Sequence, residues 1–541
     1  MQTLTKTLSG AQILIKTLQN LEVDTVFGYP GGIVLDVYDE LGKQEVVKHY
    51  LVRHEQAAVH AAEGYARVSG KCGVALVTSG PGATNIVTGL ANAYLDNYPL
   101  VVITGQVCAN LLHKDAFQEV DIIDITRNCT KAGFQVTSAN DLENSLVNAF
   151  KIANSGRKGP VVVDITKNVF SEKAEFENCF QKYQDEKSYD VDVTSIVKVL
   201  KKSQKPLIIA GGGIALSGAS NELFNFAKKM NIPVVSTMMG LGTYSADDEN
   251  YFGMIGIFGQ YCANQAVREC DLLLAVGTRF NDRITCCFKI EDIAKKLVHI
   301  DIDKKEISKV IPAMLGIVGD AKDVFVKLNS GIKNFELADY SSWIKYLKTL
   351  EEKNTKPLKR SENMHSFELL KEINNCLKNR GCVITTEVGQ HQVWAARYLK
   401  FNKPNKFITS GGLGTMGFGF PAAIGACIAK KAPVVCIAGD GSFQMNVQEL
   451  ATCVDYNLPV KIFILNNGYL GMVRQFQEKT CGERYFATKI SNPDFVKLAD
   501  SYGIKAIRVT NIEDVKASID KAFSDNSPYI IDFVVEPKEL L

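Results

Sequence analysis

The sequence lacks a long apolar run. No segment reaches about 18 uncharged apolar residues, the length that a membrane-spanning helix requires. The N-terminal stretch MQTLTKTLSGAQILIKTLQN also lacks the uninterrupted apolar region of a signal peptide, and its pattern predicts a capped amphipathic helix that begins near Ser9. We therefore expect a cytoplasmic protein without a membrane partner.

A basic surface and a cysteine framework are missing as well. The 61 Lys and Arg residues balance the 59 Asp and Glu residues, and a net charge of +2 gives no basic face for nucleic acid. The fourteen cysteines contain no CxxC pair, and disulfide frameworks belong to short secreted chains. We expect reduced, mostly buried thiols and no nucleic-acid partner.

What the sequence has is a repeated alternation of strand and helix patterns. Short β-branched runs such as PVVVDIT (160–166), PLIIAGGG (206–213) and APVVCIAGD (432–440) lie between segments of helical spacing. Strands that alternate with helices predict parallel sheets covered by helices on both faces. The predicted fold class is α/β, with doubly wound parallel sheets.

The length of 541 residues is too great for a single hydrophobic core. Two polar, lysine-rich passages, 170–190 and 341–363, are interpreted as linkers between cores. They predict three domains, at 1–175, 190–335 and 360–541. The first and third domains could share a fold without visible sequence identity.

Two polar signals follow consecutive predicted strands in the third domain. Asp440 follows APVVCIAG, and Asn467 ends the next strand, PVKIFILNN, with a helical segment between them. Both side chains should emerge at the carboxyl edge of a parallel sheet, where open α/β folds bind ligands. With the backbone carbonyl of Tyr469 they supply three oxygens suited to Mg²⁺, which then takes its other ligands from phosphate and water.

The same motif offers further contacts to a phosphate. Gly441 and Ser442 lie at the entrance of the predicted helix, where backbone N–H groups and a hydroxyl can bind an anion. Alone, GDG is an ordinary turn and NN an ordinary cap. Together, with 27 residues from Asp440 to Asn467, they resemble the signature of thiamine diphosphate enzymes.

Thiamine diphosphate chemistry also needs a carboxylate at the aminopyrimidine ring. In RHEQAAVHAAEGYAR, Glu55 ends a short strand and opens a helix, which resembles the activating glutamate of these enzymes. We interpret His54 as a helix-end residue and Glu63 as a solvated or capping carboxylate. Upstream, Gly31 and Gly32 form a turn that either approaches a ligand or is an ordinary glycine-rich turn.

The resemblance covers nearly the whole chain and is greatest to the catalytic subunits of the acetohydroxyacid synthase family, also called acetolactate synthases. The motifs that carry it are FGYPGG (27–32), HEQAA (54–58), SGPGATN (79–85), ITGQV (103–107), DAFQE (115–119), RFNDR (279–283), VGQHQVWAA (388–396), GGLGTMGFGFPAAIGA (411–426) and GDGSFQMNVQELAT (439–452).

This resemblance implies a role for further residues. Met416 would support the bent conformation of the cofactor, and its other contacts would come from Val388, Gly389, Gln390, His391, Leu413, Leu470, Gly471 and Met472. The substrate channel would be formed by Phe117, Gln118, Lys167, Met472, Val473 and Phe476. Without the resemblance, Lys167 would be interpreted as a surface lysine.

The resemblance also implies an FAD, bound without redox use, in the central domain. The matching positions are Arg157, Gly212, Gly213, Thr237, Met238, Gly259, Arg279, Arg283, Asp301, Ile302, Asp320 and Ala321. Arginines can pair with a diphosphate, and an acid after a strand can accept ribose hydroxyls. Asn281 and Phe258 depart from the family pattern, which usually has aspartate and histidine there.

The implied reaction is the decarboxylating ligation of pyruvate to a second 2-oxo acid. Pyruvate as acceptor gives 2-acetolactate and 2-oxobutyrate gives 2-aceto-2-hydroxybutyrate, the first common step of branched-chain amino-acid synthesis. The resemblance implies a homodimer or homotetramer with active sites at the subunit interface, and a possible small regulatory subunit.

Two departures keep other reactions open. Phe476 replaces the tryptophan that shapes the acceptor pocket in the family, and the sequence ends at FVVEPKELL where relatives usually continue, so that either it stops short or closure is achieved differently. The alternatives are a carboligase that uses another ketone, such as a keto sugar, a pyruvate oxidase and a 2-oxo acid decarboxylase.

Overall fold

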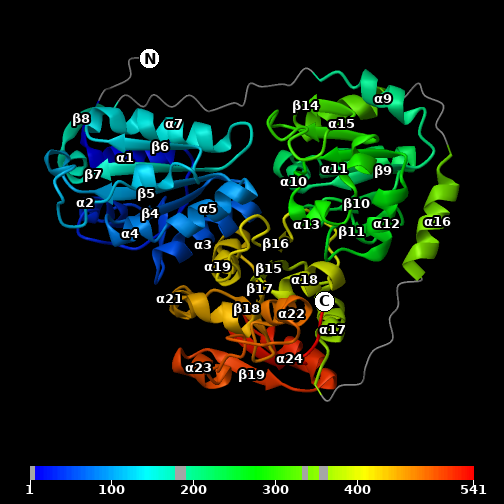
Figure 1. The fold of residues 1–541 in the computed structure, drawn as a ribbon. Helices are drawn as coiled ribbons and strands as arrows, with labels where there is room; N and C mark the ends of the chain where they lie inside the picture. Colours follow the sequence, from blue (N-terminus) through cyan, green and yellow to red (C-terminus); the bar gives the residue numbers. More distant parts are fainter. Residues whose placement is uncertain (1–5, 177–190, 332–338, 353–362) are drawn as a thin grey trace. The chain divides into compact units, whose positions relative to one another are not determined.

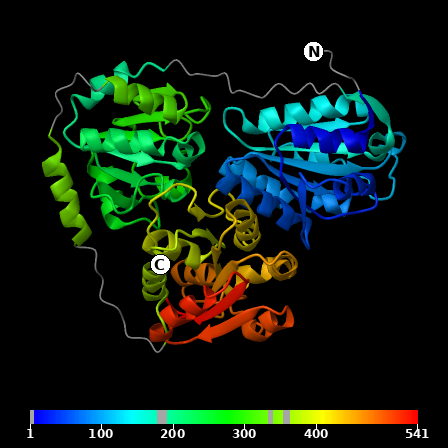
Figure 2. The ribbon, with the colours of Figure 1, turned by 180° about the vertical axis from the view of Figure 1, so that it is seen from behind.

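The computed structural model describes residues 6–176, 191–331, 339–352 and 363–541, and these residues form three parallel six-stranded sheets with helices around them (Figure 1). The first and third sheets belong to one compact unit and the central sheet to another. Helices cover both faces of each sheet, and the view from behind gives the same layering (Figure 2). The predicted α/β class is confirmed, whereas the domain boundaries stay a prediction.

The first sheet has the strand order β3-β2-β4-β5-β7-β6. Its strands are β2 (Thr25–Gly28), β3 (Lys48–Leu51), β4 (Gly73–Val77), β5 (Leu100–Gln106), β6 (Ala132–Val136) and β7 (Pro160–Thr166). The helices of this region are α1 (Gly10–Asn20), α2 (Leu35–Gly42), α3 (Glu55–Ser69), α4 (Pro81–Thr84), α5 (Val87–Asp96), α6 (Ile122–Thr126), α7 (Leu142–Asn154) and α8 (Lys167–Ser171), with short 3-10 turns η1 (Ala109–Leu111) and η2 (Ala139–Asp141). Two further strands, β1 (Lys6–Ser9) and β8 (Lys173–Phe176), pair antiparallel.

Local signals explain several of these elements. Ser9 caps α1 and Gln12 closes a capping box, as the sequence predicts for a helix that begins there. Strands β5 and β7 are buried at every position, because helices cover both faces of a parallel sheet. Glu55 is the first residue of α3, as predicted, but it does not end the strand, because β3 stops at Leu51 and residues 52–54 lie between them.

The central sheet has the order β11-β10-β9-β12-β13-β14, the strand order of dinucleotide-binding folds. Its strands are β9 (Pro206–Ala210), β10 (Val234–Ser236), β11 (Tyr251–Met254), β12 (Leu272–Val276), β13 (Leu297–Asp301) and β14 (Leu315–Val318). The helices are α9 (Thr194–Leu200), α10 (Gly212–Ser217), α11 (Ser220–Met230), η3 (Met238–Gly240), α12 (Tyr261–Glu269), α13 (Asp282–Thr285), α14 (Ile290–Ala294), α15 (Ala321–Gly331), α16 (Ser341–Glu352) and α17 (Ser366–Leu377).

Two predictions need correction here. The passage 341–363 is not only a linker, because α16 packs on the central sheet with Trp343 buried and its Nε1 donating to the Pro206 carbonyl at 3.1 Å. The other predicted linker begins with α8 and β8, and most of its remainder lies outside the described residues. Of the thirteen described cysteines only five are buried, so the expectation of mostly buried thiols is wrong.

The third sheet has the order β16-β15-β17-β18-β20-β19. Its elements are β15 (Val383–Thr386), α18 (Gln390–Tyr398), β16 (Phe407–Ile408), α19 (Gly419–Lys430), β17 (Val434–Gly439), α20 (Asp440–Phe443), η5 (Gln444–Glu449), α21 (Leu450–Asp455), β18 (Val460–Asn466), α22 (Gly471–Thr480), α23 (Phe495–Ser501), β19 (Lys505–Val509), η6 (Ile512–Asp514), α24 (Val515–Ala522) and β20 (Tyr529–Val534). Numbered along the chain, the first and third sheets have the same strand order, which explains their suspected common fold.

The first and third sheets share one apolar core, and α3 and α19 cross within it at backbone distance. A Cβ placed on Gly64 would lie 2.1 Å from the Ala422 carbonyl oxygen, and one on Gly425 would lie 1.8 Å from that of Ala61. Only glycine allows this approach, so the two sheets dock through a glycine contact.

None of the described helices combines the length and apolar composition that crossing a bilayer requires.

We predict that Gly64→Ala lowers the free energy of unfolding by about 1–3 kcal/mol, because the new methyl group forces the α3 and α19 backbones apart. Denaturant titration measures this loss. Gly42→Ala is the matched control, since nothing lies within 4 Å of a Cβ at that helical residue. Equal stability of the two variants would contradict the close contact.

Candidate active site

The two predicted metal-ligand loops meet at the carboxyl edge of the third sheet. Asp440 follows β17 and is buried, and its Oδ2 accepts a hydrogen bond from the Gly468 N–H at 2.8 Å in the loop after β18. In that loop Asn467 Oδ1 accepts the Tyr469 N–H at 2.9 Å. The predicted juxtaposition of these loops is therefore present.

A residue that the sequence did not indicate holds this carboxylate. Asn492 Nδ2 donates to Asp440 Oδ2 at 2.7 Å and to Asn466 Oδ1 at 3.0 Å, and Gln444 Nε2 donates to Asn492 Oδ1 at 3.0 Å. Burial raises the pKa of Asp440, and the donation from Asn492 opposes that rise. Asn492 lies in an irregular segment without a motif, so no pattern could have identified it.

The oxygen set at this edge fits Mg²⁺. It consists of one carboxylate, the Asn467 amide oxygen and a backbone carbonyl, which are the hard oxygen ligands that this ion prefers. Among the described residues, no group of three or more His, Cys, Asp and Glu side chains is arranged to hold a metal. A cation at Asp440 would therefore depend on oxygens of its ligand as well as on the protein.

A buried histidine faces the same edge with one ring nitrogen unpartnered. His391 is 6% exposed, and its Nε2 has no hydrogen-bond partner. Cβ atoms on Gly389 and Gly439 would lie 2.9 and 2.8 Å from its ring, and Gly389 has a φ of 153° that favours glycine. An orphaned buried nitrogen beside two such glycines is what an absent polar ligand such as a diphosphate would explain.

The other predicted diphosphate contacts converge here. Gln390 Nε2 donates to Gln475 Oε1 at 2.9 Å, while a Cβ on Gly471 would lie 2.1 Å from Gln390 Oε1. A Cβ on Gly441 would lie 2.9 Å from Leu470 Cδ2, and Ser442 Oγ donates to the Gly439 carbonyl at 3.3 Å. Two separate loops and the start of α18 therefore surround the end of β17.

The segment from 409 to 417, which we call the glycine loop, carries Leu413 and Met416. Glu387 fixes its end, because its carboxylate accepts the N–H groups of Gly417 at 2.6 Å and Phe420 at 2.9 Å. Burial raises the pKa of Glu387 to about 7, and these donors oppose the rise. A Cβ on Gly414 would lie 4.0 Å from Val388 Cγ1, so the loop adjoins the predicted diphosphate contacts.

Glu55 lies in a second cluster, at the carboxyl edge of the first sheet. Asn85 Nδ2 donates to Glu55 Oε2 at 2.9 Å, and a Cβ on Gly82 would lie 3.4 Å from Glu55 Oε1. A Cβ on Gly31 would meet the Thr78 side chain at 2.5 Å. Sequence reasoning missed Thr78 as a site residue, although its buried hydroxyl is unpartnered beside Glu55.

Within one chain, the start of the glycine loop is bound from the end of α3 that lies away from Glu55. Glu55 begins α3, whereas Arg67, twelve residues later, donates from Nη1 to the Thr409 carbonyl at 3.0 Å. Twelve residues of helix span about 18 Å. A Cβ on Gly32 would have nothing within 4 Å.

The predicted substrate residues lie in three places: Phe117 and Gln118 in the loop after β5, Lys167 at the first position of α8, and Met472, Val473 and Phe476 in α22. Gln118 has a φ of 62° and packs against Gly80, whose Cβ would lie 2.8 Å from that of Gln118. The Glu119 carboxylate accepts the N–H groups of His113, Lys114 and Ala116 and thereby fixes this loop, which lowers its pKa. The exposed members of the set are Phe117, Lys167, Val473 and Phe476, and Met472 is half-buried.

The predicted FAD residues belong to both units. Arg157 lies in the first unit, where its Nε donates to Asn97 Oδ1 at 2.6 Å. Residues after five neighbouring strands of the central sheet share its carboxyl edge: Gly212 and Gly213, Thr237 and Met238, Arg279 and Arg283, Asp301 and Ile302, and Asp320 and Ala321. Asn281 Oδ1 is buried without a partner, and Gly259 packs against the Met254 carbonyl. The positions at this edge of the central sheet fit a nucleotide.

We predict that His391 remains neutral well below neutral pH. Burial lowers the pKa of His391 to about 3 from an ordinary value of 6.5. In the unfolded chain the ring is protonated below about pH 6.5, so stability falls as the pH drops from there toward 3. His391→Asn removes this contribution, about 2 kcal/mol between pH 6.5 and 5.

Nuclear magnetic resonance tests this directly, with the His391 signal identified by its loss in the variant. The ring should stay neutral at pH 5, and a titration midpoint near 6.5 would show that it is exposed.

Comparison with known proteins identifies the family of the chain. Family models for thiamine pyrophosphate enzymes match along the chain: the N-terminal TPP binding domain at 8–125, the central domain at 193–328 and the C-terminal TPP binding domain at 387–533. A probable acetolactate synthase large subunit of Methanocaldococcus jannaschii is 43% identical over 99% of this chain and 93% of its own length. The acetolactate synthase isozyme 2 large subunit of Escherichia coli is 42% identical over 98% and 96%. The chain therefore belongs to the acetolactate synthase large-subunit family of thiamine pyrophosphate enzymes.

Proposed function

We propose that this protein joins pyruvate to a second 2-oxo acid with loss of CO₂, giving 2-acetolactate or, with 2-oxobutyrate, 2-aceto-2-hydroxybutyrate. The observation that carries the proposal is the paired arrangement at the third sheet, where the Asp440 carboxylate meets the Gly468 N–H beside the unpartnered His391 nitrogen. The names of relatives more than 40% identical over almost the whole chain support the same reaction.

The residues at this edge would bind the cofactor's diphosphate. Asp440, Asn467 and the Tyr469 carbonyl would hold Mg²⁺, and the backbone N–H groups at Gly441 and Ser442 would bind phosphate oxygens at a helix start. When bound, thiamine diphosphate supplies a carbon nucleophile and an electron sink for the decarboxylation of 2-oxo acids. The protein contributes the position, the charge and the exclusion of water.

Glu55 would hold a proton at the aminopyrimidine ring nitrogen. Its carboxylate is held by Asn85 and backed by the small residue Gly82, so that one oxygen is fixed while the other lies toward the glycine. A general acid or base of this kind contributes about 10²- to 10⁴-fold to a rate. Removing the carboxylate should therefore affect turnover more than binding.

The predicted substrate residues would bind and separate the two acids. Gln118 and Lys167 offer polar groups to a carboxylate or keto oxygen, and Phe117 and Phe476 offer apolar surface that keeps water out. Phe476, which stands where the family often has tryptophan, would set the size of the acceptor pocket. The two candidate acceptors are pyruvate and 2-oxobutyrate.

We further propose that active sites form between two copies of the chain. About 18 Å of helix separates Glu55 from the residue that binds the glycine loop of the same chain. A second copy in a twofold dimer would supply the missing half of each site. Four further features stay predictions: the dimeric or tetrameric state, a small subunit, a cytoplasmic location, and a non-redox FAD on the central sheet.

Product analysis tests the function. We expect purified protein with pyruvate, thiamine diphosphate, Mg²⁺ and FAD to form 2-acetolactate, and Glu55→Gln to lower that rate by at least about 100-fold. Exposed Glu22→Gln is the matched control and should keep the wild-type rate.

Other products identify the alternatives. Under anaerobic conditions, acetaldehyde would indicate a decarboxylase, and peroxide formed only with oxygen would indicate an oxidase. Ligation only to an added keto sugar would indicate the related carboligase. Any of these in place of 2-acetolactate contradicts the proposal.

A mixture of two inactive variants tests the shared site. We predict that refolded mixtures of Glu55→Gln and Asp440→Asn chains regain about a quarter of the wild-type activity, because each mixed dimer keeps one intact site. If Glu55 and Asp440 acted from the same chain, no mixed dimer would be active. The two variants kept in separate tubes are the control.

A further inference from the structure

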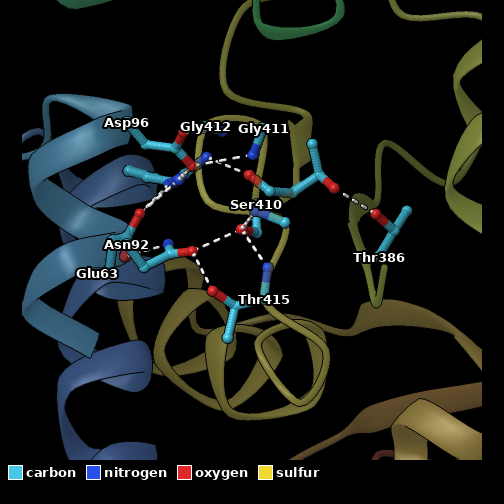
Figure 3. Close-up of polar contacts among 11 residues, drawn as sticks. Glu63, Asn92, Asp96, Thr386, Ser410, Gly411, Gly412 and Thr415 are labelled. Atoms are coloured by element: carbon cyan, nitrogen blue, oxygen red, sulfur yellow. Dashed lines mark hydrogen bonds and ion pairs between the residues drawn. The ribbon is translucent and has the colours of Figure 1, made fainter. Parts of the chain in front are cut away.

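Glu63 does not lie in solvent or at a helix end, as the sequence suggested, but is fully buried in the middle of α3. It belongs to a group of four buried polar side chains from α3 and α5, which we call the charge cluster: Glu63, Arg67, Asn92 and Asp96. Figure 3 shows how Glu63, Asn92 and Asp96 face the glycine loop. The interpretation of Glu63 as a solvated or capping carboxylate is wrong.

The guanidinium of Arg67 links both carboxylates of the cluster. Its Nε donates to Glu63 Oε1 at 3.1 Å and its Nη2 to Asp96 Oδ2 at 2.6 Å. The ring of Tyr98 lies 4.1 Å beneath the guanidinium carbon. The side chains of Arg67, Glu63 and Asp96 are at most 2% exposed, so these charges are shielded from water.

Asp96 extends the cluster to the glycine loop. Its Oδ1 accepts the Gly412 N–H at 2.7 Å and its Oδ2 accepts the Gly411 N–H at 3.1 Å (Figure 3). With the bond from Arg67 to the Thr409 carbonyl, contacts to three of the first four residues fix the beginning of the loop.

Asn92 fixes the rest of the loop through the hydroxyls of Ser410 and Thr415. Its Nδ2 donates to Glu63 Oε2 at 2.9 Å, and its Oδ1 accepts from Ser410 Oγ at 2.5 Å and Thr415 Oγ1 at 2.9 Å. Ser410 Oγ in turn accepts the N–H groups of Gly414 at 3.0 Å and Thr415 at 2.8 Å. The loop is therefore folded around Ser410 up to the residue before Met416.

The position of Asp96 is unfavourable for its own helix. It is the last residue of α5, where the helix dipole disfavours a carboxylate, and two buried carboxylates share one guanidinium. Apolar residues of similar volume would often be as stable at such a place. What the carboxylate provides instead is a pair of acceptors for consecutive loop N–H groups.

We propose that Asp96 and Asn92 are positioning residues, which hold the glycine loop in the shape that presents Leu413 and Met416 to the cofactor. The part of this inference that concerns the cofactor rests on the proposed function. The part that concerns the shape of the loop does not. The first sheet of each chain thus prepares the diphosphate side of the same chain, while its Glu55 serves the other site.

Asp96→Asn and Ser410→Ala test the proposal in the full-length protein. Asp96→Asn replaces one acceptor by a donor, and Ser410→Ala removes only the hydroxyl on which the loop folds. Thr126→Val is the matched control, because it deletes an equally buried hydroxyl, bonded to Ile122, far along the chain from the loop. Thermal unfolding checks that each variant is folded.

The first readout is hydrogen exchange of residues 409–418 without cofactor, and the second is the Kd for thiamine diphosphate at fixed Mg²⁺. We expect the loop amides to exchange about tenfold faster and the Kd to rise about tenfold in both variants, but not in the control. This is the effect of losing one buried hydrogen bond to a charged or polar partner. Even at saturating cofactor, the kcat of both variants should stay below that of the wild-type protein.

Unchanged exchange in Ser410→Ala, or faster exchange with an unchanged Kd, would overturn the proposal, as would equal effects in Thr126→Val. If Asp96→Asn does not fold, Ser410→Ala decides alone. If the wild-type protein takes up no thiamine diphosphate, the proposed function fails, and the exchange data still decide whether these side chains hold the loop.

Discussion

The backbone contact between α3 and α19 is the constraint on which the other features depend. Gly64 and Gly425 let the two helices touch, so that the first and third sheets share one core. Only with the sheets at this separation can Arg67 and Asp96 reach the glycine loop. Glycines cost helix stability, and here that cost is offset by apolar surface buried between the sheets.

The docked sheets give α3 two roles that differ along its length. Its C-terminal half fixes a loop of its own chain, whereas its first residue, Glu55, is the one that we propose acts in the active site shared with a second copy. The third sheet also supports this second role, because Glu449 accepts the Arg53 N–H at 2.9 Å and the Tyr456 hydroxyl accepts the Leu51 N–H at 2.8 Å. A dimer would thereby couple the fold of each chain to the chemistry of both sites.

The sequence predicted the features that depend on local pattern. Strands were visible as β-branched runs, Ser9 as a cap, and Asp440 with Asn467 as strand-end residues that must share a sheet edge. Contacts between distant segments leave no such pattern. Asn492 lies in an irregular loop, and Glu63 looked solvated because its partners Arg67 and Asn92 are recognisable only once α3 and α5 are packed. The helix α16 was misinterpreted because its polar face resembled a linker.

The central claim is that the Asp440 edge binds a diphosphate through a divalent cation. Calorimetric titration of the protein with thiamine diphosphate, in Mg²⁺ and again with a chelator, tests this most directly. The account predicts saturable binding with Mg²⁺ and loss of that binding on chelation. Equal affinity without any divalent cation would contradict it.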